Sequence, residues 1–392
     1  MLGAFPPQAQ GIQEYCREVA ETLAVAVDVH AIGFHRMYPA VVFPGVKTAM
    51  DPAKPPLQAA GLDVEHRLTW YNPTGWALRA TRVSCDIFHL QWWSLPLFPV
   101  SMVFLYAMRK RRKPIVVTVH NVLPHEGSRN FLCASRLICR HADRVVIHSE
   151  TNRHQLIEHY GLAAERVAQI PMGFAGAALP APPRDQARAA LGLNRDRRYL
   201  LSFGTIRPYK GIMDLIDAFA SVAPVYPDAD LIVAGKPWED WTPYAERVQA
   251  LGLSERIHTY LGYQPEDRVP LFYGATDLLV LPYTHFDAQS AVGAQALAYD
   301  VPILVSDVGG LPDWVDHDTN WIVQPGDCLS LASALARFLD DPIGHHDAFR
   351  DIAGRVRARL SRPTIAQAYA NLYQEIQEQP LTKPHRGHER WE

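Results

Sequence analysis

The chain has 392 residues, of which 48% are hydrophobic and 20% charged, with a formal net charge of −3. This length exceeds one ordinary hydrophobic core and suits two domains of roughly 150–200 residues each, and the composition describes a globular rather than a disordered protein. The small net charge excludes a global attraction to nucleic acid, so any anion-binding site has to be local.

The cysteines and the termini also limit the class of protein. The five cysteines are scattered, with neither a CxxC pair nor zinc-type spacing, which favours free thiols in a reducing compartment and hence the cytoplasm. The first residues do not resemble a signal peptide, and no run of about 18 apolar residues indicates a membrane span. Residues 1–5 look like the end of a first strand, so either that strand is short or the real start lies further upstream.

Along the chain, short β-type runs alternate with amphipathic helical stretches, which predicts parallel sheets covered by helices on both faces. In the first half, helical patterns at 12–24 and 151–161 are interleaved with expected strands at 24–34, 86–93, 113–120, 143–149 and 166–171. The second half restarts the alternation with expected strands at 199–204, 229–235, 256–262, 277–283 and 302–307. Continuous apolar runs within these strands are typical of parallel strands buried on both faces.

The small, proline-rich stretch 175–186 separates the two halves. The expected organisation is a Rossmann-like domain at 1–178, a linker at 179–196, a second Rossmann-like domain at 197–361, a C-terminal helix at 362–378 and a polar tail at 379–392. Ligands of open parallel sheets bind at the carboxyl ends of the strands, and with two such sheets we expect a site in the cleft between them.

The first candidate segment is FGTIRPYKGIMDLIDAF at 203–219. A strand ends at Phe203, a loop with Gly204, Arg207 and Lys210 follows, and Gly211 opens an amphipathic helix. A loop that leads into a helix N-terminus supplies unpaired N–H groups and a favourable dipole for an anion, to which the two cations add. The pattern favours a phosphate or diphosphate site; the alternative is that both cations are solvated loop charges.

The second candidate segment lies at 282–315, where a loop leads into a helix of small residues that begins near Gln289. Asp287 stands just before this helix, where a carboxylate caps N–H groups or accepts hydroxyl groups. Gln295 follows about two turns later on nearly the same side. The alternatives are a simple N-cap for Asp287 and an ordinary polar helix residue for Gln295.

Taken together, these segments resemble the retaining glycosyltransferases of the GT-B fold, in the family that includes sucrose-phosphate synthase and bacterial polysaccharide glycosyltransferases (glycosyltransferase family 4-like). The resemblance covers almost the whole chain in order: the opening glycine loop, TVHN at 118–121, the stretch 148–174, FGTIRPYKG and the block that ends in DVGGLPDWV. It implies an acceptor-side first domain, a nucleotide-sugar-binding second domain, and a C-terminal helix that returns to the first domain.

The resemblance assigns the catalytic and donor-binding roles. Arg207 and Lys210 bind the diphosphate of a UDP- or GDP-sugar, while His120 and Asp287 position the sugar. The donor-binding segments comprise Gly204, Gly211, Ser290, Ala291, Val292 and Gln295. The family usually has two glutamates where this chain has Asp287 and Gln295, and the glutamine keeps an acceptor oxygen for the ribose but loses the charge.

On the acceptor side, the resemblance points to the loop at Gln10 and Gly11, where the family usually has a glycine pair. His125 and Glu126, in the loop after His120, are further candidates for acceptor contact. For His120 itself, the alternative is a histidine at a strand end with only local hydrogen bonds.

One further motif reads as a metal site. Asp228-Ala-Asp230 has the pattern of a metal-binding DxD, but it precedes a strand, on the side away from the expected cleft, so we expect no metal and no other cofactor.

The stretch 94–113 joins an apolar segment to five basic residues. It is either a helix packed in the core or a peripheral contact with an anionic membrane.

The expected function is metal-independent transfer of a sugar, with retention of configuration, from a nucleotide sugar to a hydroxyl of a glycan, a lipid-linked saccharide or a small molecule. The rival expectations are a nucleotide-sugar epimerase and a catalytically weak or inactive glycosyltransferase-like subunit, the latter because of the altered glutamate pair. Base, sugar and acceptor depend on loop shapes that the sequence does not reveal.

Overall fold

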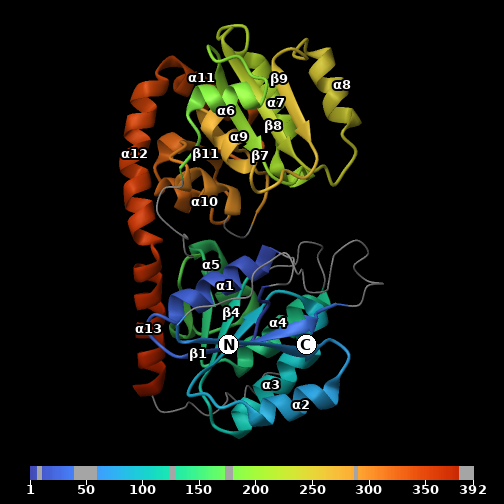
Figure 1. Ribbon diagram of the computed structural model, residues 1–392, viewed down its shortest axis with the longest axis vertical. Helices are drawn as coiled ribbons and strands as arrows, with labels where there is room; N and C mark the ends of the chain where they lie inside the picture. The colour runs from blue at the N-terminus through green and yellow to red at the C-terminus, as the bar shows by residue number, and fades with distance from the viewer. Residues whose placement is uncertain (7–10, 39–59, 123–128, 173–179, 287–289, 379–392) are drawn as a thin grey trace. The chain divides into compact units, whose positions relative to one another are not determined.

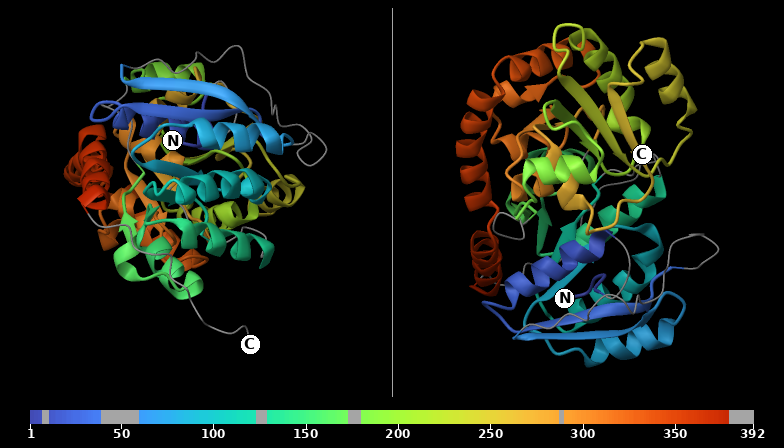
Figure 2. Two further views of the ribbon diagram at one scale, coloured as in Figure 1. Left: turned by 90° about the horizontal axis from the view of Figure 1, so that it is seen from below. Right: turned by 45° about the horizontal axis from the view of Figure 1, so that its top comes forward.

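The computed structural model describes residues 1–6, 11–38, 60–122, 129–172, 180–286 and 290–378. The chain divides into two compact units: unit 1 comprises residues 1–175 and 360–392, and unit 2 comprises residues 176–359. Each unit is built on parallel strands covered by helices (Figures 1 and 2). This arrangement confirms the predicted α/β class with two parallel-sheet domains.

The first helix of unit 1 is α1 (Gly11–Leu23). The paired strands of this unit are parallel. Its strands are β1 (Val29–Arg36), β2 (Leu62–Thr69), β3 (Phe88–Trp92), β4 (Ile115–Val119), β5 (Arg144–Ile147) and β6 (Val167–Gln169). Its other helices are α2 (Pro73–Arg82), α3 (Phe98–Lys110), α4 (Arg129–His141), α5 (Glu150–Tyr160) and α13 (Arg362–Glu378), with short 3-10 turns η1 (Leu95–Leu97) and η2 (Ala164–Arg166).

The N-terminal residues complete the sheet of unit 1. Strands β3-β4-β5-β6 form one ladder and β1-β2 another. Leu2 bridges the two ladders, because it pairs in parallel with Ile32 of β1 and with Leu90 of β3. The expected first strand is therefore present as a short central segment.

The two faces of this sheet differ in polarity. Along β3, the apolar residues Phe88, Leu90 and Trp92 pack into one core cluster together with α2, α3, α4 and α5. The alternating residues His89 and Gln91 have the opposite side-chain direction, because successive strand residues point to opposite faces. A second core cluster joins the strands to α1 and α13, so polar groups are buried under these two helices.

The C-terminal helix α13 belongs to unit 1, where it lies beside α1 (Figures 1 and 2). Tyr369 of α13 is fully buried, and its hydroxyl is 3.1 Å from that of Tyr15 of α1. α13 thus forms part of the core of unit 1.

Helix α3 accounts for the apolar-basic stretch at 94–113. Its residues Val100, Phe104, Leu105 and Met108 are buried in the core. Arg109 donates to the carbonyl oxygen of His141 and forms an ion pair with Asp143. The apolar face of α3 is thus occupied by the core, and within the described chain no helix is long and apolar enough to cross a membrane.

Unit 2 is a six-stranded sheet of order β12-β11-β10-β7-β8-β9 in which neighbouring strands are parallel. Its strands are β7 (Arg198–Phe203), β8 (Ala229–Gly235), β9 (Ile257–Leu261), β10 (Leu278–Leu281), β11 (Ile303–Ser306) and β12 (Ile322–Val323). Its helices are α6 (Arg184–Ala190), α7 (Ile212–Val222), α8 (Thr242–Ala250), α9 (Val269–Ala275), α10 (Ala291–Ala298), α11 (Cys328–Asp340) and α12 (Pro342–Arg359). The 3-10 turns are η3 (Pro208–Lys210), η4 (Pro312–Val315) and η5 (Thr319–Trp321).

Part of the stretch expected to be a linker is regular structure, because α6 lies within 179–196. Arg188 of α6 is 3% exposed and forms a 2.8 Å ion pair with Asp277, which also accepts a hydrogen bond from the backbone N–H of Tyr199. These contacts attach α6 to the sheet of unit 2.

The packing of α13 leads to a stability test. Tyr369→Ala removes a fully buried ring from the core of unit 1 and should lower the free energy of unfolding by about 3–5 kcal/mol. Gln367→Ala, on the exposed side of the same helix, should change it by less than about 0.5 kcal/mol. Urea unfolding followed by circular dichroism measures both; equal stabilities for the two variants would contradict this packing.

Candidate active site

The loop after β7 lies close to the ends of β10 and α10. Gly204 has φ +101°, and a Cβ added to it would lie 3.2 Å from Cγ2 of Val292. Gly211 has φ +64°, and a Cβ there would lie 1.9 Å from the carbonyl oxygen of Pro282. Glycine alone tolerates both this backbone and this approach, so the two glycines allow the loop to pack against its neighbours.

Two helices start beside this loop, and among the described residues no N-cap side chain caps either start. Gly211, the N-cap of α7, has no side chain to cap its helix, and the side chain of Ser290, the N-cap of α10, accepts no hydrogen bond from its helix. The first N–H groups of a helix have no partner within the helix and carry partial positive charge. Both helix starts therefore suit an anionic ligand.

Arg207 stands just before η3, and its side chain stacks on an aromatic ring. The central guanidinium carbon lies 4.2 Å from the ring centroid of Trp238, in the loop after β8. Among the described residues, no carboxylate forms an ion pair with Arg207. Its positive charge thus remains available to a ligand.

Lys210 is buried without a described carboxylate partner. It is 8% exposed, its amine lies 4.2 Å from the ring centroid of Tyr283, and it donates a hydrogen bond to the Tyr283 hydroxyl. Burial, followed by repulsion from Arg207, lowers the pKa of Lys210 to about 8. An anion bound beside Lys210 would stabilise the charged form of the amine and so raise this pKa again.

Tyr283 connects Lys210 to the start of α10. Its hydroxyl is also 3.1 Å from the Ser290 hydroxyl oxygen, and both residues are buried. The structure thus brings together the predicted residues of the two segments: Gly204, Arg207, Lys210, Gly211, Ser290, Ala291 and Val292 lie around one loop and two helix starts. Asp287, the other predicted catalytic residue of these two segments, lies outside the described residues.

Gln295 lies inside α10, where its side-chain oxygen is already engaged. Oε1 accepts a 2.9 Å hydrogen bond from the hydroxyl of Tyr273, which also donates to the carbonyl oxygen of Val292 at 3.3 Å. Tyr273 thus fixes the orientation of this amide. Asp300, just after the end of α10, has φ +59° and forms an ion pair with Arg357.

In unit 1, His120 follows β4 and is almost fully buried. Its Nε2 is 2.8 Å from Oε1 of Gln91, and its ring contacts those of Tyr15 and His148 at centroid distances of 4.7 and 5.3 Å. Burial, with His148 and His89 nearby, holds the pKa of His120 well below its ordinary value. The ring is therefore neutral at pH 7 and suited to hydrogen bonding rather than to charge.

The partners of His120 define its hydrogen bonding. The amide nitrogen of Gln91 lies 3.2 Å from Nε2 of His89, so the amide oxygen accepts from Nε2–H of His120. His89 in turn is 2.7 Å from the hydroxyls of Thr118 and Tyr373. This network runs from α13 through the sheet to His120 and fixes the orientation of its ring.

The other predicted acceptor-side residues are only partly described. Gly11 is the first residue of α1. Gln10, His125 and Glu126 lie outside the described residues, and nothing in the structure bears on them.

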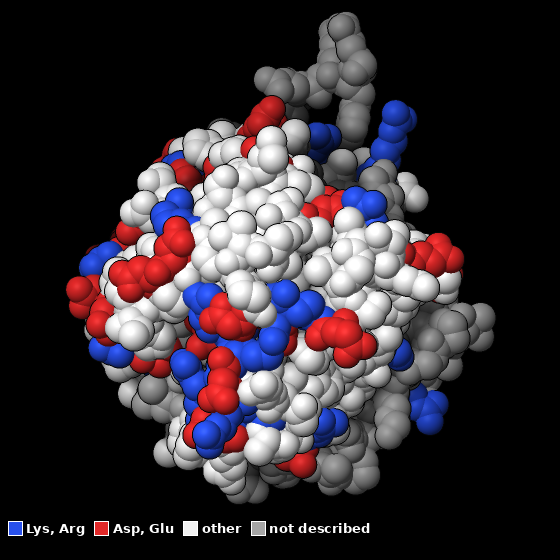
Figure 3. All heavy atoms as spheres, turned by 90° about the horizontal axis from the view of Figure 1, so that it is seen from above, with Lys and Arg blue, Asp and Glu red and all other residues white. Residues whose placement is uncertain are grey.

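The DxD carboxylates belong to an ion-pair cluster at the N-terminal end of β8. Asp230 is 1% exposed, and its carboxylate contacts Arg197, Arg256 and His258; Asp228 pairs with Arg198. Basic and acidic side chains also alternate near the centre of the face in Figure 3. Within the described chain, no three His, Cys, Asp or Glu residues are grouped to hold a metal.

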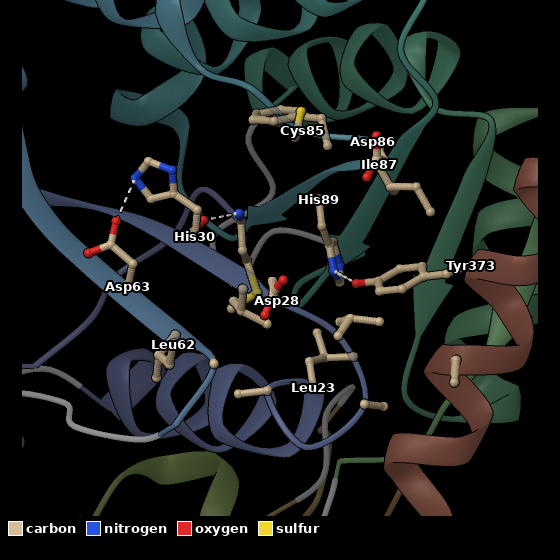
Figure 4. A pocket seen from close by; sticks show the side chains of 18 of the residues that line it. Leu23, Asp28, His30, Leu62, Asp63, Cys85, Asp86, Ile87, His89 and Tyr373 are labelled. Atoms are coloured by element: carbon tan, nitrogen blue, oxygen red, sulfur yellow. Dashed lines mark hydrogen bonds and ion pairs between the residues drawn. The ribbon is translucent and has the colours of Figure 1, made fainter.

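A cavity of about 1130 Å³ lies in unit 1 (Figure 4). It is lined by the first residues of three strands, among them Val29, Leu62 and Phe88, and by Tyr373 of α13. None of the predicted site residues lines it. Because ligands of parallel sheets bind at the opposite, carboxyl ends of the strands, this cavity is distinct from the candidate site.

Sequence reasoning missed residues next to the predicted ones in each unit: His89, Gln91 and His148 near His120 in unit 1, and Tyr283 and Trp238 near Lys210 and Arg207 in unit 2. His89 and Gln91 could have been found from the alternation of polar and apolar residues in a strand that otherwise reads as fully buried. Tyr283 and Trp238 stand two and three residues after strand ends but carry no motif.

The comparisons with known proteins agree with this fold. The family described as Glycosyltransferase Family 4 matches residues 9–175, and Glycosyl transferases group 1 matches residues 183–355. Two similar solved structures are sucrose-phosphate synthase from Thermosynechococcus elongatus (TM-score 0.69, 21% identity, 94% of each chain) and HepE from Anabaena in complex with UDP (TM-score 0.72, 18% identity, 95% of this chain and 99% of that one).

Among curated proteins, D-inositol 3-phosphate glycosyltransferase from Nocardia farcinica is 30% identical over 59% of this chain and 54% of its own length. The mannosyltransferase LpsB of lipopolysaccharide core biosynthesis from Rhizobium meliloti is 28% identical over 50% and 57%. The chain thus spans less than two thirds of the length of these relatives. From the two family matches and the shared architecture, the chain belongs to the family 4-like glycosyltransferases of the GT-B fold.

Proposed function

We propose that this chain transfers a sugar from a nucleoside-diphosphate sugar to a hydroxyl acceptor, with retention of anomeric configuration and without a metal ion. The observation that carries the proposal is the pairing of Arg207 and Lys210 beside two uncapped helix starts, with no described carboxylate to neutralise either cation. A diphosphate provides the charge that this arrangement lacks. The family membership supports the reaction class, and the retaining outcome rests on the family resemblance alone.

The proposed chemistry follows from where charge develops. When the bond between the sugar and the diphosphate breaks, negative charge increases on the leaving diphosphate. Fixed cations and N–H groups that face this charge lower the barrier, commonly by more than any other single effect. Arg207 offers a two-pronged donor and Lys210 a point charge, so together they take the place that a divalent metal occupies in other phosphate sites.

The remaining predicted residues keep the roles that the resemblance implies. Asp287 and His120 position the sugar, and His120 does so as a neutral ring held by Gln91. Gln295 holds the ribose through the hydrogen-bonding capacity of its side-chain amide that the bond from the Tyr273 hydroxyl does not use. Gln10, Gly11, His125 and Glu126 contact the acceptor.

The acceptor class is left open by these residues. Relatives named for D-inositol 3-phosphate and for lipopolysaccharide core show that similar chains are associated with small polyols and with lipid-linked glycans. If the acceptor is lipid-linked, the protein makes a peripheral contact with the membrane, and this contact is mainly electrostatic. It would use the exposed residues Lys110, Arg111 and Arg112, since the apolar face of α3 is in the core.

A second candidate function is a glycosyltransferase-like subunit with little activity. The observation that favours it is the hydrogen bond from the Tyr273 hydroxyl to the side-chain oxygen of Gln295. A neutral amide whose oxygen already accepts one hydrogen bond binds hydroxyl groups more weakly than the carboxylate of a glutamate. Isothermal titration with UDP and with GDP separates the two functions, because an inactive partner is expected to bind neither nucleotide.

The diphosphate assignment is tested by substitution of the two cations. Arg207→Ala and Lys210→Ala should each reduce donor turnover by roughly 100-fold or more, as expected for loss of a group that stabilises the leaving diphosphate. Arg195→Ala, an exposed arginine before β7, is the matched control and should retain full turnover. Nearly unchanged turnover in both cation variants would refute the assignment.

The pKa of Lys210 predicts how nucleotide affinity varies with pH. The protonated amine attracts the diphosphate, and the free protein loses this proton above about pH 8, so UDP or GDP affinity should fall as the pH rises from 7.5 to 9. The second ionisation of a phosphate, near pH 6, is complete over this range. In Lys210→Arg the charge does not titrate and the affinity should stay level. A wild-type affinity that is constant up to pH 9 would contradict the role of Lys210.

Removal of divalent ions tests the proposed independence from metal. Arg207 and Lys210 supply the charge at the diphosphate, and the DxD carboxylates are held by arginines. Treatment with EDTA should therefore leave most of the transfer activity intact. Complete loss of activity, restored by Mn²⁺, would show that a metal takes part.

A further inference from the structure

Trp238 contacts the side chain of Arg207 and is also hydrogen-bonded to the backbone of Ile206, the residue before Arg207. The N–H of Trp238 donates to the carbonyl oxygen of Ile206 at 3.0 Å, and the N–H of Ile206 donates to the carbonyl oxygen of Lys236 at 2.9 Å. This short ladder joins the loop after β7 to the loop after β8. It holds the backbone of Trp238 beside Ile206, the residue that precedes Arg207 in the chain.

The partner of Arg207 is unusual within unit 2. Most arginines of this unit pair with a carboxylate, as Arg188 does with Asp277 and Arg247 with Asp217. Arg207 instead lies over the indole ring, which is 64% exposed, with a distance of 4.2 Å to its centroid. Lys210 also lies near an aromatic ring, that of Tyr283, but it donates a hydrogen bond to the hydroxyl of that residue.

The choice of partner affects what the cation can do next. A carboxylate would orient the guanidinium but would also neutralise it and compete with a phosphate for the same N–H donors. An aromatic face attracts the cation through its quadrupole, adds no charge and occupies no N–H donor in the plane of the guanidinium. An indole partner therefore restricts Arg207 to few orientations while its donors remain free.

We propose that Trp238 is a positioning residue that orients Arg207 for the diphosphate without neutralising it. This proposal rests on the proposed function, because it requires that Arg207 binds a diphosphate. It assigns a binding role to a tryptophan that no sequence motif marks.

The test uses inorganic pyrophosphate as the probe, measured by isothermal titration at pH 7.5 with the full chain. Pyrophosphate has no base, so a change in its affinity cannot come from stacking of a nucleobase on the indole. Trp238→Leu removes the aromatic face and should weaken pyrophosphate about two- to fivefold, the range of a partly exposed cation–π contact. Trp238→Phe keeps an aromatic face and should restore most of the affinity.

Trp238→Glu separates orientation from neutralisation. The carboxylate can still orient Arg207 through an ion pair, but it cancels the charge and takes the donors. The affinity should therefore fall about tenfold or more, below that of Trp238→Leu. Trp241→Leu is the matched control: Trp241 belongs to the same loop but stacks on Tyr244, at a centroid distance of 4.9 Å, and its loss should leave pyrophosphate binding unchanged.

The outcomes distinguish this inference from the proposed function. If Arg207→Ala loses pyrophosphate while Trp238→Leu and Trp238→Glu bind it like the wild type, the positioning role is wrong and the diphosphate site stands. A Trp238→Leu variant that weakens UDP but not pyrophosphate makes Trp238 a base contact and also overturns the inference. If Arg207→Ala binds pyrophosphate normally, the proposed function itself fails.

Discussion

A buried lysine that has no carboxylate partner in the described part of the chain is the constraint on which this account depends. Removal of Lys210 from water disfavours its charged form, which lowers its pKa to about 8. Proteins usually compensate a buried cation with an anion of their own. Here the described surroundings of Lys210 are the rings of Tyr209 and Tyr283, a helix start and a second cation, with no carboxylate among them, and such surroundings suit an anionic ligand.

The two units bury polar groups in different ways, and the difference agrees with the separate binding roles that we propose for them. In unit 2 the candidate site combines cations with uncapped helix starts, an arrangement that suits phosphate oxygens. In unit 1 the polar face of the sheet carries neutral histidines linked by Gln91, Thr118 and Tyr373. Neutral rings exchange hydrogen bonds with hydroxyl groups, so the chemistry of unit 1 suits a sugar or polyol.

Much of this architecture could be predicted from the sequence, because continuous apolar strands and amphipathic helices leave strong local patterns. The strands β7 to β11 and the cation loop at Arg207 and Lys210 were found in this way, since each strand is short, apolar and followed by glycine, proline or a charged residue. Strand β2 was missed because its buried and exposed residues do not alternate regularly. Trp238 could not be assigned, because its contact with Arg207 joins two loops that are far apart in the sequence. Helix α6 was hidden by the prolines that precede it.

A crystal structure of the protein with UDP or GDP bound tests the central claim most directly. The account requires the diphosphate to lie against the guanidinium of Arg207, the amine of Lys210 and the first N–H groups of α10. A nucleotide bound elsewhere in the protein, with the loop between β7 and α7 unoccupied, would contradict it.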